Sequence, residues 1–581
     1  MKFFLSTFLF CLASICAFAV PAKRVPFKVL LTNGDSLTVV MVGDENCHYL
    51  ASFADGTPVV LESEGVYRLA PEQKEELMKN WQERLAKRNT RRLERKNKLF
   101  ANNGEMRKAA GRPVSIFTGK KRGIVILADY EDKSMKPTST IDEFKNMFNE
   151  KGYSKNDHIG SVHDYFYDQS YGQFDLEFDI YGPVKLSKPL SYYGKNDSGG
   201  NDMHVGEMTI EVCKLADSAY DINWKNYDWN DDDEVDLVFI IYAGYGEYAG
   251  APSYTVWPHE FSLTECLLFD DGDGPVEFDG VMIDTYAMSC ELYGASGSRM
   301  SGIGLACHEF SHCLGLMDTY DASYSGGFGM DAWDLMASGN NSGINYNGEV
   351  PCGFTAYERA ETGWLTLKEL DAPCDVENFP SLNDSPTAYV IYNDGNRNEY
   401  FIIENRQSAG WFQYVEDYTG FHGLLITHVD YDKQVWADNL INANSKHQRM
   451  TIIPAGKKYG TLRGGQYYVS ESHYAAHLFP GKEKAIELTN TSHADCGGAL
   501  FNNNTDGTKC MNKPITDIVE SADGLISFKF MGGSTAIDDI RNVSDNDAEE
   551  WFTLDGIKID KPIRQGIYIV RKNGKTFKIR Q

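Results

Sequence analysis

Apolar residues follow two patterns along the chain, one typical of strands and one typical of helices. A continuous apolar run at residues 124–128 and a mainly apolar one at 235–242 predict buried strands. Between them, residues 141–149 and 162–171 carry apolar side chains that predict two helices. Because strands and helices are mixed in this region, we expect an α/β or α+β domain.

Short strand-like pieces dominate the regions on either side. Residues 25–61 contain such pieces around turn signals at 33–34 and 55–56, and a charged helix is expected over about 71–99. Beyond residue 370 the chain is strand-rich, with apolar runs at 388–392, 400–403, 423–429 and 525–530. We therefore expect a β-rich domain to follow the mixed one.

One stretch, residues 302–318, combines a helical apolar pattern with reactive side chains. His308 and His312 are four residues apart, which places both imidazoles on one face of a helix, at a separation that suits zinc. Glu309 lies to the side of the pair, where it can accept a proton from a water on the metal instead of binding the metal. The pattern H-E-x-x-H on a helix is typical of zinc-dependent peptidases.

A third zinc ligand must come from beyond this helix. Gly315 permits a sharp turn because it lacks a Cβ, and Asp318 can then offer a carboxylate. Asp321 has the same chemistry, and two further aspartates lie near the turn that carries Met336, namely Asp331 and Asp334. Three protein ligands leave a fourth position open for water, which is typical of a catalytic rather than a structural zinc site.

An acidic loop at residues 228–236 predicts a second metal. Hard oxygen ligands at this spacing suit Ca²⁺, and the candidate ligands are Asp228, Asn230, Asp232 and Asp236. The loop is not an EF-hand, because Asp233 replaces the usual glycine and the terminal bidentate glutamate is missing. The alternative interpretation is a solvated acidic turn that precedes a strand.

The composition and the N-terminal residues indicate which binding partners and which location the protein has. Asp and Glu number 83 against 56 Lys and Arg, so the net charge of −27 makes nucleic acid or an anionic membrane an unfavourable partner. Residues 1–19 have a charged start, an apolar run and a small-residue cleavage signal, which predicts a secretory signal peptide and no membrane span. In an exported protein some of the cysteines are expected to form disulfides; Cys496 with Cys510 is one candidate pair, although spacing does not fix the connectivity.

The zinc motif and its surroundings resemble the immune inhibitor A family of secreted metalloproteases. The likeness covers about 120–530 and includes several further segments: 161–166, 170–174, 333–339, 356–365, 404–407 and 422–430. The resemblance implies a metzincin-like fold, zinc-dependent endopeptidase activity and, often, bound calcium. It assigns His308, His312 and Asp318 as zinc ligands and Glu309 as the base. Asp318 is preferred over Asp321 because it fits the family pattern H-E-x-x-H-x-x-G-x-x-D.

These changes of pattern divide the chain into five segments. The expected order is signal peptide, prosegment, zinc protease domain, β-rich accessory domain and C-terminal β module, at 1–19, 20–118, 119–369, 370–533 and 536–581. The last module resembles the C-terminal sorting modules of exported Bacteroidota proteins, which implies recognition by export machinery. An accessory β unit without a sorting role is the alternative.

We therefore expect a secreted or cell-surface zinc endopeptidase, made as a zymogen, that hydrolyses protein or peptide substrates with water activated by Glu309. Two alternatives stay open: a zinc hydrolase of a non-peptide or peptidoglycan amide bond, and a surface adhesin with a vestigial protease fold. Cys47 is the one cysteine in 20–118. As a thiolate it can occupy the open zinc position; as a buried thiol it is structural.

Overall fold

A computed structural model of the chain describes residues 21–22, 26–44, 47–63, 65–81, 117–197, 200–323, 326–463, 466–493, 511–534, 549–554, 557–561, 566–572 and 575–580. The predicted signal peptide, most of the predicted charged helix and the candidate pair Cys496 and Cys510 lie outside these ranges. Within them, no helix is both long enough and apolar enough to cross a membrane.

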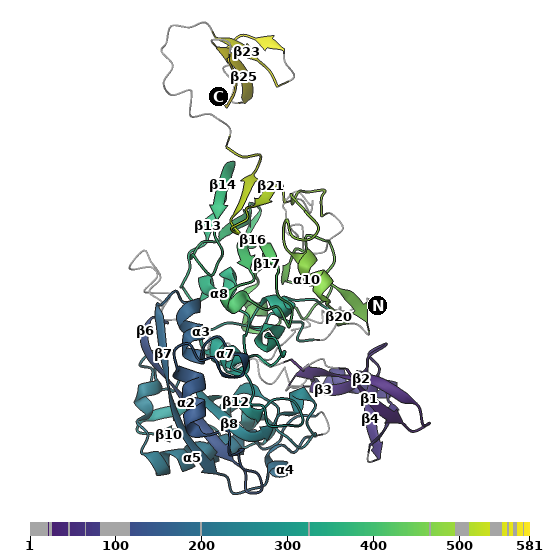
Figure 1. The fold of residues 1–581 in the computed structure, drawn as a ribbon, viewed down its shortest axis with the longest axis vertical. Coiled ribbons are helices and arrows are strands. Elements are labelled where there is room, and N and C mark those ends of the chain that lie inside the picture. Colours follow the sequence, from purple (N-terminus) through teal and green to yellow (C-terminus); the bar gives the residue numbers. More distant parts are fainter. Residues whose placement is uncertain are drawn as a thin grey trace, which may run out of the picture.

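A five-stranded sheet forms the centre of the mixed domain (Figure 1). Its strands, in spatial order, are β7 (Phe174–Lys185), β6 (Gly119–Asp129), β8 (Val238–Tyr245), β12 (Thr285–Leu292) and β9 (His259–Ser262). The first four are parallel, whereas the edge strand β9 runs antiparallel to β12. Strands β6 and β8 confirm the two buried runs predicted from the sequence.

Helices lie on both faces of this sheet. They are α2 (Ile141–Asn149), α3 (Val162–Gln169), α5 (Val205–Tyr220) and α7 (Gly304–Cys313), with shorter elements α4 (Leu190–Tyr193), α6 (Leu263–Cys266), β10 (Val276–Phe278) and β11 (Val281–Ile283). The predicted helices at 141–149 and 162–171 are confirmed as α2 and α3, and α7 lies within the predicted 302–318 stretch. Helix α5 and strand β7 were not predicted, since their polar positions interrupt the apolar pattern.

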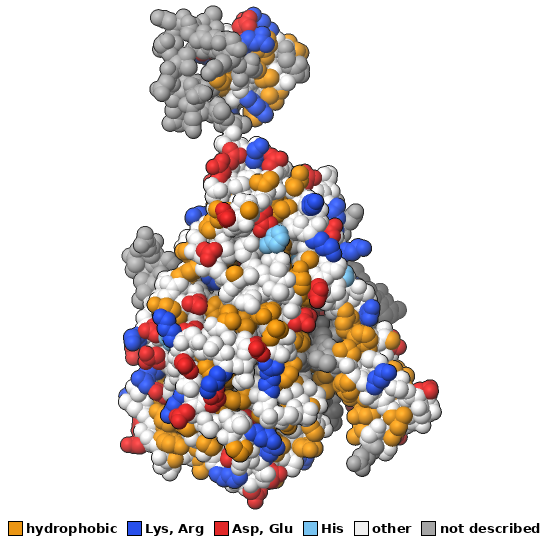
Figure 2. Space-filling view, viewed as in Figure 1, with side chains coloured by type: hydrophobic (Ala, Val, Ile, Leu, Met, Phe, Trp, Pro, Cys, Tyr) orange, Lys and Arg blue, Asp and Glu red, His pale blue; other side chains and the backbone are white. Residues whose placement is uncertain are grey.

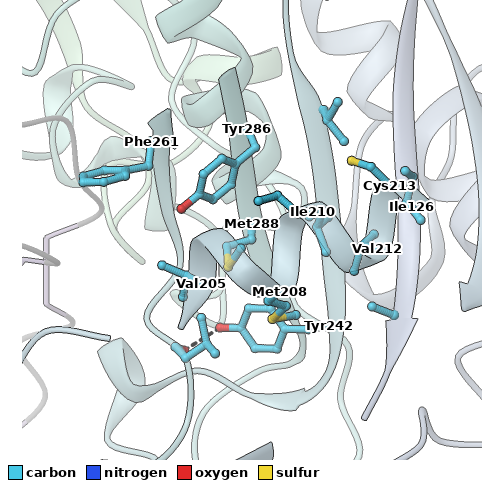
Figure 3. Packing of buried hydrophobic residues seen from close by; sticks show 14 of the residues in the cluster. Ile126, Val205, Met208, Ile210, Val212, Cys213, Tyr242, Phe261, Tyr286 and Met288 are labelled. Atoms are coloured by element: carbon cyan, nitrogen blue, oxygen red, sulfur yellow. Dashed lines mark hydrogen bonds between the residues drawn. The ribbon is translucent and has the colours of Figure 1, made fainter. Parts of the chain in front are cut away.

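The packing of strand β6 explains why residues 124–128 are all apolar. Ile124 and Ile126 pack into a core with α5, whereas Val125 and Leu127 pack into the opposite core with α2, α3 and α7. Successive strand side chains point to opposite faces, so helices on both faces require a continuous apolar run. Figure 3 shows the α5 side, where Ile126 and Met208 belong to the same buried cluster.

The region after residue 365 is β-rich, as predicted. One sheet has the order β13 (Lys368–Glu369), β15 (Tyr389–Asn393), β16 (Asn396–Gln407), β17 (His422–Asp430) and β18 (Met450–Ile452). A second has the order β14 (Cys374–Phe379), β22 (Ile526–Phe530) and β21 (Ile515–Glu520). The same region also contains α9 (Lys433–Ala437), β19 (Thr461–Arg463), β20 (Gln466–Tyr468) and α10 (Glu471–His477), and α8 (Ala356–Glu361) lies just before it.

Two smaller units lie at the ends of the described chain. The N-terminal one is a closed barrel of β1 (Phe27–Leu31), β2 (Ser36–Asp44), β3 (Cys47–Ser52), β4 (Pro58–Ser63) and β5 (Val66–Leu69). The C-terminal one is a sheet of β24 (Lys558–Ile559), β23 (Glu550–Phe552), β25 (Ile567–Lys572) and β26 (Lys575–Arg580). Apolar side chains gather on the face of the barrel that Figure 2 shows. The exposed large apolar residues of the barrel strands are Phe27, Leu30, Leu61 and Leu69.

The barrel packs against both larger domains. His48 of β3 stacks on Trp257 with ring centroids 4.1 Å apart, and its Nε2 lies 3.2 Å from Glu247 Oε1. Phe53, just past β3, makes an edge-to-face contact with Tyr468 of the β-rich domain at 4.7 Å. These contacts fix the barrel beside the edge of the central sheet.

The described cysteines form no disulfides with one another, contrary to the expectation for an exported protein. All eight in the described ranges are thiols, and seven of these are buried. Burial raises the pKa of the Cys213 thiol to about 12 and that of Cys290 to about 11. These cysteines therefore behave as small apolar core residues in this structure.

Candidate metal centre

Helix α7 presents the two predicted histidines from the middle of the molecule. All ten of its residues are buried. The helix begins at Gly304. This position requires glycine, because a Cβ there would lie 1.8 Å from the Asn340 carbonyl oxygen. Gly315 adopts a φ of +80° directly after the helix, as the predicted sharp turn requires. His308 and His312 lie one turn apart, with ring centroids 4.9 Å apart.

Each histidine is oriented by a backbone carbonyl. His308 Nδ1 lies 2.9 Å from the Leu335 carbonyl oxygen, and His312 Nδ1 lies 2.9 Å from the Leu316 carbonyl oxygen. Because a carbonyl only accepts, each Nδ1 must carry the proton, and this leaves the Nε2 lone pair for a metal. The sequence predicted the pair but not these two carbonyls.

Asp318 completes a three-residue group. Its Oδ1 lies 3.3 Å from His308 Nε2 and 3.7 Å from His312 Nε2. Two ligands about 2.1 Å from a tetrahedral zinc ion are about 3.4 Å apart, so the three atoms fit such an ion. Within the described ranges, this is the one group of three His, Cys, Asp or Glu side chains whose ligand atoms all lie within 4.8 Å of one another.

The Asp318 carboxylate is held by a residue of the β-rich region. Asn439, which follows α9 in the β-rich domain, donates its Nδ2 to Asp318 Oδ2 at 2.7 Å, while its Oδ1 accepts the Asp318 backbone N–H at 2.7 Å. Both residues are buried. Asn439 is 121 residues from Asp318, so no local pattern in the sequence could have indicated it.

The turn at Met336 lies next to the candidate ligands, as expected from its position in the sequence. The Met336 carbonyl accepts the backbone N–H of Thr319, at 2.8 Å, and the preceding carbonyl of Leu335 orients His308. Asp334 caps the turn by accepting the Met336 N–H at 2.7 Å. Burial raises the pKa of Asp334 to about 6 and raises that of the nearby Glu358 carboxyl as well.

Residues 127–365 match the family described as immune inhibitor A peptidase M6, catalytic domain. The chain contains an M6 peptidase domain. It is 26% identical over 235 residues to a pre-pro-metalloprotease named PrtV from Vibrio cholerae serotype O1, a match that covers 37% of this chain and 25% of the relative. It is also 23% identical over 296 residues to immune inhibitor A of Bacillus thuringiensis subsp. alesti, across 43% of this chain and 42% of that protein. The matches thus span less than half of these relatives.

Glu309 lies in the M6 domain between the two histidines on α7. Its side chain is fully buried. Since it is one residue past His308, it projects about 100° round the helix from that ligand. This position separates Glu309 from the three converging atoms while keeping it on the same turn of the helix.

The other aspartates near the site have different partners. Asp321 accepts the backbone N–H groups of Ser323, Gly326 and Gly327, at 3.0, 2.9 and 2.7 Å, so it holds the loop that follows Asp318. Asp331 accepts hydrogen bonds from the Ser338 and Tyr474 hydroxyls, at 3.0 and 2.9 Å. Among the four candidate aspartates, the M6 domain brings Asp318 to the histidines.

The candidate calcium loop has a different geometry. Asp228 accepts the backbone N–H of Asp232, at 3.1 Å, and that of Asp233, at 2.9 Å. Asn230 accepts the Asp232 N–H at 3.1 Å, and Asp236 accepts the Trp229 N–H at 2.6 Å. The three aspartates of the proposed ligand set do not form a group with oxygens within 4.8 Å of one another. Calcium in this loop stays a prediction.

Proposed function

We propose that the protein is a secreted zinc-dependent endopeptidase that hydrolyses protein or peptide substrates. One observation carries the proposal: His308, His312 and Asp318 converge within an M6 peptidase domain, with Glu309 on the same helix. The nitrogen and oxygen donor set suits Zn²⁺ and leaves a position for water. Two relatives that match this domain bear the names immune inhibitor A and pre-pro-metalloprotease PrtV.

Each chemical role falls to a named residue. Zinc, when bound there, supplies a Lewis acid that polarises a carbonyl and lowers the pKa of a water. His308, His312 and Asp318 would hold it, and the Leu335 and Leu316 carbonyls keep both imidazoles in the required tautomer. Glu309 accepts the proton of the attacking water and then delivers it to the leaving amine.

We further propose that the N-terminal barrel keeps the enzyme latent as a prosegment. Pro21 and Ala22 line a cavity of about 160 Å³ together with Tyr320, Asp321 and Ser338, which flank the third ligand and the Met336 turn. The histidines and Asp318 are at most 4% exposed in this form of the chain. We therefore favour steric blocking by the N-terminal unit, through the segment that precedes the barrel, as the account of latency.

The alternative account of latency, in which Cys47 binds the metal as a thiolate, has less support. Cys47 packs against Trp81, and its Sγ donates to the Leu77 carbonyl oxygen at 3.6 Å. These contacts hold the buried thiol against the segment that follows the barrel, as a structural cysteine. Cys47→Ser should accordingly give a precursor that is still latent.

A casein digest of the secreted product, with and without a zinc chelator, tests the enzymatic proposal. Cleavage that the chelator abolishes and added zinc restores is expected. No cleavage of casein, together with release of products from peptidoglycan, would favour a zinc amidase instead. Inactivity on both substrates by a zinc-loaded, processed chain would favour an adhesin. N-terminal sequencing of the product would locate the processing site.

A further inference from the structure

One segment of the β-rich domain, residues 439–451, covers the loop 318–329 that carries the third metal-binding side chain. Asn442 donates to the Thr319 carbonyl oxygen at 2.6 Å. Further along, the Gly329 N–H donates to Gln448 Oε1 at 2.6 Å, and the Gly329 carbonyl accepts from Thr451 Oγ1 at 2.8 Å. The loop is therefore shaped by another domain at both of its ends.

Asn439 is the member of this segment that reaches a metal-binding side chain. Its amide forms two hydrogen bonds of 2.7 Å to Asp318, one to the carboxylate and one from the backbone N–H. Asn439 is 1% exposed and has a φ of +55°, a left-handed conformation that Asn tolerates better than most residues. The pair of bonds fixes both the position of Asp318 and the rotation of its carboxylate.

We propose that Asn439 is a positioning residue of the metal centre, and that the centre is complete only when the β-rich domain is docked. The inference rests on the proposed function. The N–H donor engages Oδ2, and Oδ1 is thereby directed toward His308 and His312. Without this donor the carboxylate can rotate away from the histidines, and zinc must then fix it at an entropic cost.

This assignment extends the metal-binding unit beyond the matched domain. The M6 match ends at residue 365, and the sequence predicts a domain boundary near 369, whereas Asn439 lies far past both. The catalytic and β-rich regions therefore act as one unit with respect to the metal. The β-rich domain contributes a residue to the centre in addition to any part in substrate binding.

The test compares Asn439→Gly with Asn405→Ala in the full-length chain. Glycine adopts the left-handed backbone without strain, so Asn439→Gly removes both hydrogen bonds while preserving the turn. Asn405 is a matched control: it is a buried amide of the same domain whose Nδ2 donates to the Phe379 and Gly524 carbonyl oxygens, both at 2.8 Å. The readouts are the zinc dissociation constant, from competition with a chromogenic chelator, and the melting temperature of the zinc-free chain.

We expect the zinc dissociation constant of Asn439→Gly to rise about 10- to 100-fold, whereas Asn405→Ala lowers the melting temperature but leaves zinc affinity within about twofold. Equal zinc affinity in the two variants would overturn the inference. If Asn439→Gly does not fold, Asn439→Asp serves instead, because it keeps an acceptor for the Asp318 N–H but opposes Oδ2 with an oxygen; unchanged zinc affinity there would also overturn the inference. A wild-type chain that binds no zinc would refute the proposed function itself.

Discussion

Helix α7 and the acidic loop at 228–236 both present metal-binding side chains at suitable spacing, yet they use those side chains in opposite ways. In α7, His308 and His312 direct Nδ1 to backbone carbonyls and Nε2 toward Asp318. In the loop, Asp228 directs both carboxylate oxygens to backbone N–H groups of the loop itself.

The difference shows what spacing alone leaves undecided. A helix fixes its backbone hydrogen bonds internally, so side chains four residues apart are presented together to a third group. A short loop has unsatisfied N–H groups, and Asp or Asn side chains satisfy them locally. A strong metal site therefore needs ligand atoms that are oriented by partners outside the ligand set, as the Leu335 and Leu316 carbonyls orient the two histidines.

The largest expected effect comes from removing Asp318, the third side chain of the group that it forms with His308 and His312. Asp318→Ala should weaken zinc binding by at least about 100-fold and abolish proteolysis, since it deletes a ligand. Asp321→Ala is the matched control, because Asp321 accepts backbone N–H groups of the following loop. Zinc content after dialysis measures both; full zinc in Asp318→Ala and none in Asp321→Ala would reverse the assignment.

The next effect separates metal binding from proton transfer. Glu309→Gln keeps the shape of the side chain but cannot accept a proton, so turnover of a peptide substrate should fall about 10²–10⁴-fold. Zinc content should stay at the wild-type level, because Glu309 is outside the converging group. Substantial turnover by the zinc-loaded variant would remove Glu309 from its role as the base.

A smaller effect is expected in the acidic loop. Asp228→Asn should lower the free energy of unfolding by about 1 kcal/mol in calcium-free buffer, because its single amide oxygen can accept only one of the two backbone N–H groups that the Asp228 carboxylate accepts. Thermal unfolding with and without calcium provides the measurement. If calcium raises the melting temperature of the wild-type chain but not that of Asp228→Asn, the loop binds Ca²⁺. The loop and α7 would then both be metal sites.

The smallest effect concerns the pair formed by Glu247 and His48 of the barrel. Burial by itself would lower the pKa of His48, but Glu247, the Asp44 carbonyl and the nearby Asp202 together outweigh it and raise the pKa above its ordinary value of 6.5. His48 also contacts the Asp44 carbonyl, with its Nδ1 at 3.0 Å. Protonated His48 thus stabilises barrel docking below about pH 6.5, and this contribution is lost as the pH rises through the higher pKa of the docked state.

The matched variant for this pH effect is His48→Gln. Thermal unfolding should show a melting temperature lower than wild type by a few degrees at about pH 6, and the difference should shrink by about pH 9. The wild-type chain supplies the reference at each pH. A difference that is the same at both pH values would mean that His48 contributes through stacking on Trp257 and not through charge.

The sequence by itself determined the local features. Helical spacing placed His308, Glu309 and His312 on α7, and continuous apolar runs located strands β6 and β8, because helix and strand geometry depend on residues close together in the chain. The H-E-x-x-H motif also indicated a zinc peptidase before any contact was known. The helix predicted near 141–149 coincides with α2, whose start is fixed locally because the Thr140 side chain accepts the Glu143 N–H.

Only the tertiary structure decided which partners meet across long stretches of chain. It brought Asp318, rather than Asp321 or Asp331, to the histidines, and it supplied Asn439 from 121 residues away. It also placed Cys47 of the barrel strand β3 against Trp81, which follows the barrel in the chain. The physical reason is the same in each case: a carboxylate, an amide or a thiol has several possible partners of similar strength, and burial by distant segments selects among them.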